Sequence, residues 1–233
     1  MSIDAAIILA AGRGERLQPL TSTLAQALVP VAGRSLLERS IDRLNEHGVK
    51  NIVVNVHHLG HQIADRLNGR ARILHEECLL GTGGSVKNAL PLLGGGSFFV
   101  LNGDSLWTDG SQPMLKRLED RWNPRRMDAQ LLLHPIHKII GREPLERGNY
   151  FFEAGGLLRH RGSAMLCPHI FSGASLCHEG LFRNSPDGPF SLLQLWHQAE
   201  AVKRLFGVAH DGSWCHVATS HALAEVERAL ASV

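Results

Sequence analysis

Short apolar runs alternate with amphipathic stretches through the first 134 residues, and this alternation constrains the fold more than any other feature of the sequence. The apolar runs are rich in β-branched and aliphatic residues, as buried strands are, whereas the amphipathic stretches carry apolar residues at helical spacing. This pattern is typical of an α/β protein with a doubly wound, mostly parallel, Rossmann-like sheet. The predicted strands are residues 3–9, 51–56, 72–75, 98–101 and 129–133, and the predicted helices are residues 36–47, 59–67 and 86–92.

The alternation fades after about Pro135. A hairpin is predicted around residues 154–156, followed later by a helix over residues 192–202, a strand over 205–209 and a helix over 220–230. We expect one domain over residues 1–233, in which residues 135–233 extend the sheet built by residues 1–134. Ligands of such sheets bind in a crevice at the carboxyl ends of the strands, and the second half is expected to cover it.

Composition excludes several classes of protein. The 24 Lys and Arg residues nearly balance the 22 Asp and Glu residues, and a net charge of +2 favours neither a nucleic acid nor a membrane surface as partner. The apolar run at residues 5–11 is far shorter than the roughly 20 residues of a membrane-spanning helix, and no basic stretch precedes it, so we expect a cytoplasmic protein. The four cysteines fit no metal-binding or redox spacing and are expected to be reduced and mostly buried.

The segment L-A-A-G-R-G-E-R-L-Q-P-L-T, residues 9–21, directly follows the first predicted strand. Its small residues let a ligand approach the backbone closely, and the N–H groups of such a turn favour an anion. Leu17 stands where a G-x-G-x-x-G motif needs its last glycine, and the sequence has no G-x-x-x-x-G-K-[ST] motif. The segment therefore predicts an anion-binding turn that belongs neither to a dinucleotide-dependent oxidoreductase nor to a P-loop protein.

The chain resembles the sugar-phosphate nucleotidyltransferases, whose signature is L-A-A-G-x-G-x-R-[LM]-x-P-[LM]-T followed by P-K-[PA]-[LM]-[LV]-P. Residues 9–21 match every fixed position of the first part, and residues 27–30 match the end of the second. Gly81-Thr82-Gly83-Gly84 resembles the family's base-recognition loop, and residues 100–104 resemble the strand end that carries its metal-binding aspartate. The likeness is closest to the short bacterial N-acetylmuramate 1-phosphate uridylyltransferases, through residues 53–59 and 148–150.

The resemblance implies that a sugar 1-phosphate, most simply N-acetylmuramate 1-phosphate in cell-wall recycling, attacks the α-phosphate of a nucleoside triphosphate such as UTP and releases pyrophosphate. Mg²⁺ is the implied cofactor. Residues 1–134 would then be the nucleotide-binding half and residues 135–233 the sugar-phosphate-binding half. The implied catalytic residues are Arg16, Gln26 and Asp104. The implied nucleotide contacts are Leu9, Ala10, Ala11, Gly12, Gly14, Thr82 and Gly83. The implied sugar-phosphate contacts are Asn102, Gly148 and Asn149, and the implied metal positions are Asp104 and His216.

Two positions depart from the family pattern. Gln26 stands where the family has a lysine that contacts phosphate, and His216 stands where it has a second metal-binding carboxylate. Losing one stabiliser of the transition state commonly costs about 10²- to 10³-fold in rate, unless Arg13 or Lys87 supplies the charge. Imidazole suits Mg²⁺ poorly, so His216 would contact the metal through water, select a softer ion or bind none.

Two alternatives to the uridylyltransferase follow. One is a protein that keeps the nucleotide and sugar-phosphate cleft but is catalytically impaired. The other is an enzyme with the same chemistry and different substrates, such as mannose 1-phosphate and GTP, because base and sugar choice depend on pocket shape.

Overall fold

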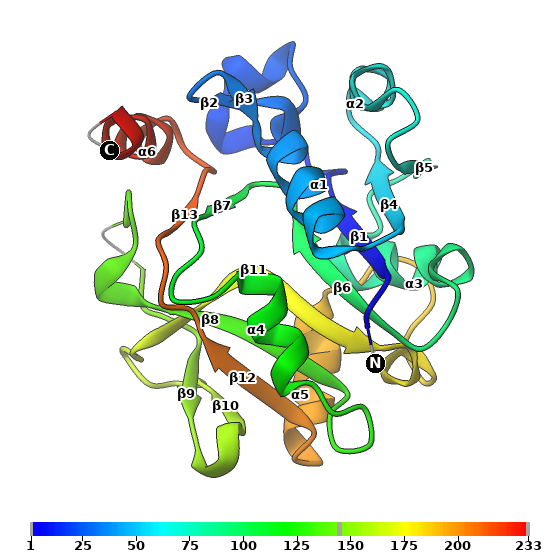
Figure 1. Cartoon of the computed structure of the whole chain (residues 1–233), viewed down its shortest axis with the longest axis vertical. Coiled ribbons are helices and arrows are strands. Elements are labelled where there is room, and N and C mark those ends of the chain that lie inside the picture. Colours follow the sequence, from blue (N-terminus) through cyan, green and yellow to red (C-terminus); the bar gives the residue numbers. More distant parts are fainter. Residues whose placement is uncertain (1, 144–145, 232–233) are drawn as a thin grey trace.

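The computed structural model describes residues 2–143 and 146–231. Within these residues nine strands form one mixed sheet, whose main path runs β10-β9-β11-β6-β1-β4-β5, while β8 pairs with β11 and β12 (Figure 1). Strands β5, β4, β1 and β6 pair in parallel, β11 runs antiparallel to β6 and β8, and β12 is parallel to β8. The strands are β1 (Ala5–Leu9), β4 (Asn51–Val56), β5 (Arg72–His75), β6 (Ser97–Asn102), β8 (Ala129–Pro135), β9 (Tyr150–Phe152), β10 (Leu158–His160), β11 (His169–His178) and β12 (Leu205–Ala209).

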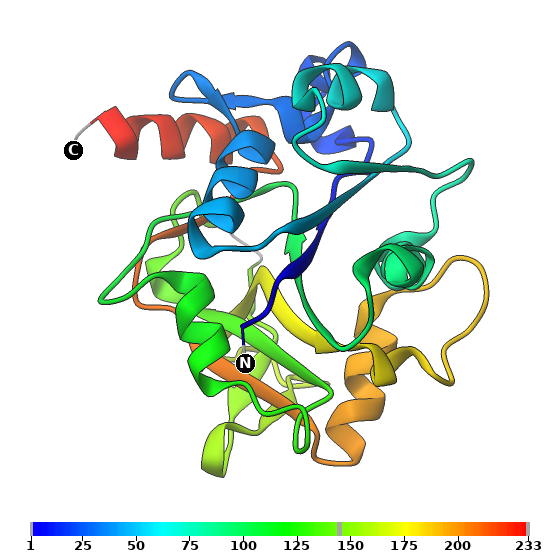
Figure 2. The same cartoon turned by 45° about the vertical axis from the view of Figure 1, so that its right-hand side comes forward.

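Helices cover both faces of this sheet. Helices α1 (Leu36–His47), α2 (Gly60–Leu67) and α4 (Met114–Arg121) contribute to one core cluster, and α3 (Gly81–Leu93) and α5 (Leu192–Ala201) to another. Figure 2 shows α1 and α4 on one side of the sheet and α3 and α5 on the other. Helix α6 (Ser220–Ala231) lies apart and packs on the short pairs β2 (Pro30–Val31) with β3 (Arg34–Ser35) and β7 (Ser105–Trp107) with β13 (Trp214–His216).

Local sequence explains why the elements begin and end where they do. The hydroxyl of Ser35 accepts a hydrogen bond from the amide of Glu38, and the Glu38 carboxylate accepts one from the amide of Ser35, which is a capping box at the start of α1. The helix stops at Gly48, whose φ of 95° suits glycine alone among common residues. Buried β-branched and aliphatic residues fill β1 and β4, as parallel strands covered on both faces require.

The predicted mostly parallel α/β sheet is confirmed, as are the strands at residues 51–56, 72–75 and 205–209 and the hairpin formed by β9 and β10. Three of the four cysteines are buried and all four are free, while Cys78 is exposed. In the part of the chain that the structure describes, no helix is both long and apolar enough to cross a membrane.

The structure corrects one expectation from the sequence and adds a long strand that the sequence did not predict. Residues 81–84, predicted as a loop before a helix over residues 86–92, form the first turn of α3. The carbonyl of Phe190 accepts hydrogen bonds from the amides of Gly83 and Gly84, so a distant segment caps a helix start that its glycines disfavour. The ten-residue β11 was not predicted, because Gly173 interrupts its apolar pattern at a β-bulge next to Asn102.

Candidate functional site

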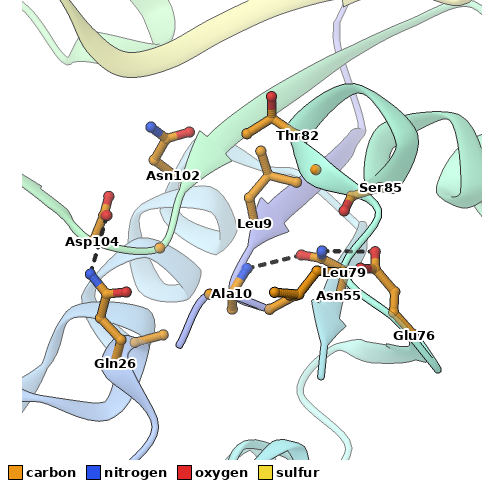
Figure 3. Close-up of a pocket in the computed structure, with 15 residues that line it drawn as sticks. Leu9, Ala10, Gln26, Asn55, Glu76, Leu79, Thr82, Ser85, Asn102 and Asp104 are labelled. Carbon is orange, nitrogen blue, oxygen red and sulfur yellow. Dashed lines mark hydrogen bonds between the residues drawn. The ribbon is translucent and has the colours of Figure 1, made fainter. Parts of the chain in front are cut away.

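A cavity of about 280 Å³, the inner cavity, opens at the carboxyl ends of β1, β4 and β6 (Figure 3). Parallel strands bring these ends to one edge of the sheet, which is the place where such sheets bind ligands. The predicted site residues that line it are Leu9, Ala10, Ala11, Gly12, Gln26, Thr82, Asn102 and Asp104. The lining also includes Gly81 and Gly103, from the two segments that resemble the family's base-recognition loop and metal-binding strand end, and Ala27, Asn55, Glu76, Leu79 and Ser85, which were not expected as catalytic or binding residues.

One end of the inner cavity is built by Ala10, Asn55 and Glu76, which we call the Asn55 network. Asn55 Oδ1 accepts from the amide of Ala10 at 2.9 Å, and its Nδ2 donates to Glu76 Oε1 at 2.9 Å (Figure 3). Asn55 is 1% and Glu76 6% exposed, and Glu76 Oε2 is a buried atom without a hydrogen-bond partner in the described chain. The signal for this network in the sequence was a polar residue inside an otherwise apolar predicted strand.

At the other end Gln26 and Asp104 line the cavity and His216 contacts Asp104, and we call these three residues the Asp104 cluster. Gln26 Nε2 donates to Asp104 Oδ2 at 3.3 Å, and His216 Nε2 lies 3.0 Å from the same oxygen. Asp104 Oδ1 is buried and has no hydrogen-bond partner among the described residues. The two departures from the family pattern, at positions 26 and 216, therefore meet on one carboxylate.

The electrostatics of this cluster follow from the Asp104–His216 contact. Burial alone raises the pKa of Asp104, but the hydrogen bond and charge of His216, together with the charge of Arg16, hold it below its ordinary value. Burial lowers the pKa of His216, but the hydrogen bond to Asp104 and the negative charge of Asp104 together outweigh that effect and raise the pKa above its ordinary value. The pair thus favours a carboxylate facing an imidazolium.

The glycine-rich turn lies against Gln26. A Cβ on Gly12 would lie 3.3 Å from Gln26 Oε1, and one on Gly14, whose φ is +65°, would lie 3.0 Å from Gln26 Cβ. Gly14, Arg13 and Arg16 line a second space of about 420 Å³, the outer cavity, which shares Gln26 and Asp104 with the inner one. The turn therefore brings two exposed guanidinium groups beside the Asp104 cluster.

The Asp104 cluster offers a divalent metal ion one unpaired carboxylate oxygen, but not a complete set of protein ligands among the described residues. In the described ranges there is no group of three or more His, Cys, Asp or Glu side chains able to hold a metal ion by themselves. Mg²⁺, however, is commonly bound through one or two carboxylates together with substrate phosphates and water. The free Oδ1 of Asp104 can serve as that single ligand, while Nε2 of His216 is engaged by Oδ2.

The remaining predicted site residues lie outside the two cavities. Asn149 Oδ1 accepts from the amide of Phe171 at 3.0 Å, beside the β11 bulge that adjoins Asn102. At Gly148, φ is +73° and a Cβ would lie 2.3 Å from the carbonyl oxygen of Cys167, so only glycine fits there. Both residues hold the hairpin of the second half against β11.

At the start of α3, Thr82 and Gly83 also make packing contacts with the segment at residues 190–192. Thr82 Oγ1 accepts from the amide of Leu192 at 2.9 Å while the residue lines the inner cavity. Gly83 does not line it, because its amide donates to Phe190 and a Cβ there would lie 2.3 Å from the Phe190 ring. Lys87 Nζ bonds Asp187 and two carbonyl groups of the same loop, so it does not supply the charge missing at Gln26.

Comparison with known proteins agrees with this geometry. Residues 5–130 match the model of the family described as nucleotidyl transferase. The chain is 37% identical to an N-acetylmuramate alpha-1-phosphate uridylyltransferase of Caulobacter vibrioides over 97% of this chain and 96% of that protein. It is 46% identical to a protein of the same name from Neisseria meningitidis serogroup B over 95% and 96% of the two chains.

Solved structures show the same fold. A putative glucose-1-phosphate thymidylyltransferase of Bacillus anthracis superposes with a TM-score of 0.81 at 16% identity, over 98% of this chain and 96% of the other. A UDP-glucose pyrophosphorylase complexed with UDP-glucose gives a TM-score of 0.80 at 14% identity over 99% of both chains. At these low identities the solved structures show only that the fold is shared. The family match and the full-length relatives show which family the chain comes from. The chain belongs to the nucleotidyl transferase family.

Proposed function

We propose that this chain transfers the uridylyl group of UTP to N-acetylmuramate α-1-phosphate and releases pyrophosphate. We propose these substrates because the chain is 37% and 46% identical to two proteins named N-acetylmuramate alpha-1-phosphate uridylyltransferase, over nearly the whole length of each. The guanylyltransferase alternative has no comparable support. The binding-only alternative has none either, because both full-length relatives are named as enzymes.

The reaction is a displacement at phosphorus. An oxygen of the sugar phosphate forms a bond to the α-phosphorus, and the bond from that phosphorus to the oxygen bridging to the β-phosphorus breaks. Both reactants are anions, so the protein must hold them together and offset their charge. Arg13 and Arg16 in the outer cavity are placed to offset the charge of the triphosphate.

The inner cavity suits the nucleoside. The free Oε2 of Glu76 accepts an N–H group, and the imide of uracil carries one. Thr82 lines the same space, and the small residues Ala10, Ala11 and Gly12 bring the backbone next to it. We assign Leu9, Gly14 and Gly83 to the same half of the site, with Gly83 acting through its packing on Phe190.

The Asp104 cluster suits the reacting phosphates. Asp104 is the residue that would hold Mg²⁺ through Oδ1, and the ion when bound supplies positive charge that neutralises phosphate oxygens. Gln26 contributes an amide donor and no charge. The β11 bulge joins this cluster to the second half of the chain, and we assign Asn102, Gly148 and Asn149 to the sugar phosphate on that ground.

The test is a matrix of substrates. The protein is incubated with Mg²⁺, each of the four nucleoside triphosphates and a panel of sugar 1-phosphates, and released pyrophosphate is measured. UTP with N-acetylmuramate α-1-phosphate is expected to give the highest rate. If no pair releases pyrophosphate while UTP still binds, the chain is a nucleotide-binding protein and the proposal is wrong.

A further inference from the structure

Three side chains from distant parts of the sequence meet on one oxygen atom in the Asp104 cluster. Gln26 precedes Asp104 by 78 positions and His216 follows it by 112, yet their nitrogen atoms lie 3.3 and 3.0 Å from Oδ2. We propose that Gln26 and His216 act as one positioning unit, in which two hydrogen bonds on Oδ2 hold the Asp104 carboxylate in one orientation at the edge of the inner cavity. A positive charge at position 26 and a negative charge at position 216 should therefore be tolerated when both are introduced, and should destabilise the protein when only one is.

The backbone fixes His216 in this unit. Strand β13 pairs with β7 so that His216 lies opposite Ser105, the residue after Asp104. The amide of Val217 donates to the carbonyl of Asp104 at 2.8 Å. The imidazole therefore reaches Oδ2 from a register that two backbone contacts define.

Packing fixes Gln26 in the same way. Its Cβ and Oε1 lie against Gly14 and Gly12, where an added Cβ would come within 3.0 and 3.3 Å. The Gln62 side chain binds the adjacent Ala25 amide at 3.0 Å and holds the short helix η3 (Gln26–Leu28) in place. A side chain at position 26 thus stays next to Oδ2, whatever its charge.

Charge then couples the two positions. An aspartate at position 216 alone would place a second carboxylate near Asp104 Oδ2, with only the neutral Gln26 amide between them, and two carboxylates at such a distance strongly disfavour joint ionisation. A lysine at position 26 alone would compete with His216 for the same oxygen. Introduced together, the lysine lies between two carboxylates and pairs with both.

The experiment compares the wild type, Gln26→Lys, His216→Asp and the double variant in a double-mutant cycle. The melting temperature is measured without Mg²⁺ or substrates, so this readout does not depend on catalysis. Gln18→Lys and His221→Asp, at exposed positions, give the effect of each new charge elsewhere on the surface. Failure of the proposed function would leave this result unaffected.

His216→Asp is expected to lower the melting temperature by about 4–8 °C, and Gln26→Lys in the same chain is expected to restore it to within about 2 °C of the wild type. The two control substitutions should add without coupling. If the effects at positions 26 and 216 simply add, the two residues are independent and the inference is overturned.

If His216→Asp does not fold, a second pair of variants tests whether His216 positions Asp104. This second test rests on the proposed function, because it measures the rate of the reaction. His216→Gln keeps an N–H donor close to the place of Nε2, whereas His216→Leu removes it. The Mg²⁺ concentration for half-maximal rate is expected to rise about 10-fold in His216→Leu and to stay within about twofold in His216→Gln, because residues that orient a metal ligand commonly affect metal affinity by 10- to 100-fold. Equal values for the two variants would contradict a positioning role.

Discussion

The Asn55 network and the Asp104 cluster each contain a buried carboxylate oxygen that has no hydrogen-bond partner among the residues that the structure describes, but the two carboxylates are held in different ways. In the Asn55 network, neutral amides hold Glu76, and the residues come from consecutive strand ends and the turn that follows β5. In the Asp104 cluster, Gln26 and His216 reach the carboxylate from 78 and 112 positions away. One end of the cleft is thus a product of local βα units, and the other depends on the packing of both halves of the chain.

This difference separates binding from chemistry. In the Asn55 network a neutral side-chain amide makes both hydrogen bonds and one oxygen of Glu76 is left to accept another, which suits recognition of an uncharged base that carries an N–H group. The Asp104 cluster gathers a carboxylate, an imidazole and the nearby Arg16, which suits a reaction among phosphates. Changes in the two networks should therefore affect different kinetic constants.

The largest effect is expected at Asp104. Asp104→Asn keeps the shape of the side chain but removes the negative charge that would hold a cation, so kcat should fall by about 10²- to 10³-fold. Pyrophosphate release at saturating substrates is the measurement. Asp120→Asn, on the exposed surface of α4, is the matched control and should retain the wild-type rate. A fall of less than threefold in Asp104→Asn would place the reacting phosphates elsewhere.

The second-largest effect is a loss of folding stability at acidic pH through His134, a buried residue near the strand β13 that carries His216. Burial lowers the pKa of His134 to about 4, and the His134 ring lies 5.9 Å from that of Trp214 in β13. The unfolded chain titrates near 6.5 at this residue, so between that pH and about 4 the unfolded chain binds more protons and stability falls as pH falls. This group alone should cost about 3 kcal/mol across that range.

Urea unfolding at pH 7, 6 and 5 measures this slope. His134→Leu should flatten it, because the variant has no proton to take up, whereas His61→Asn at an exposed position should leave it unchanged. An unchanged slope in His134→Leu would assign the acid sensitivity to other groups, such as His210, whose ring lies 5.7 Å from that of His134.

The same contrast explains what the sequence allowed to be predicted. The strands and turns of the first half follow from local patterns, and residues 9–12 were correctly expected beside the strand end. Asp104 was placed at a strand end for the same reason. The resemblance implied that Gln26, Asp104 and His216 lie at one reaction centre, but their two hydrogen bonds to one carboxylate oxygen were not predictable from local pattern. The contact of His216 depends on the register of β13 against β7, and a strand of three residues has no local signal.

The third effect is a loss of stability at Asn55. Asn55→Ala leaves the amide of Ala10 and Oε1 of Glu76 buried without their partner, which should lower the free energy of unfolding by about 2 kcal/mol. Chemical denaturation measures it, with the exposed Asn88→Ala on α3 as control. The variant should keep most of its kcat at saturating UTP. A fall in kcat as deep as that of Asp104→Asn would mean that the two ends of the cleft are not separate.

The smallest effect is expected at Glu76. Glu76→Ala removes the carboxylate of a residue that lines the inner cavity. The proposed interaction of this carboxylate with the base is the same in the ground state and the transition state. The KM for UTP should therefore rise about 10-fold with kcat little changed, since uniform binding affects KM alone. Glu77→Ala, at the next and exposed position, is the matched control and should leave both constants unchanged. Because the imide N–H is the feature being read, Glu76→Ala should also narrow the preference for UTP over CTP, and a lower kcat with an unchanged KM would instead place Glu76 with the reacting phosphates.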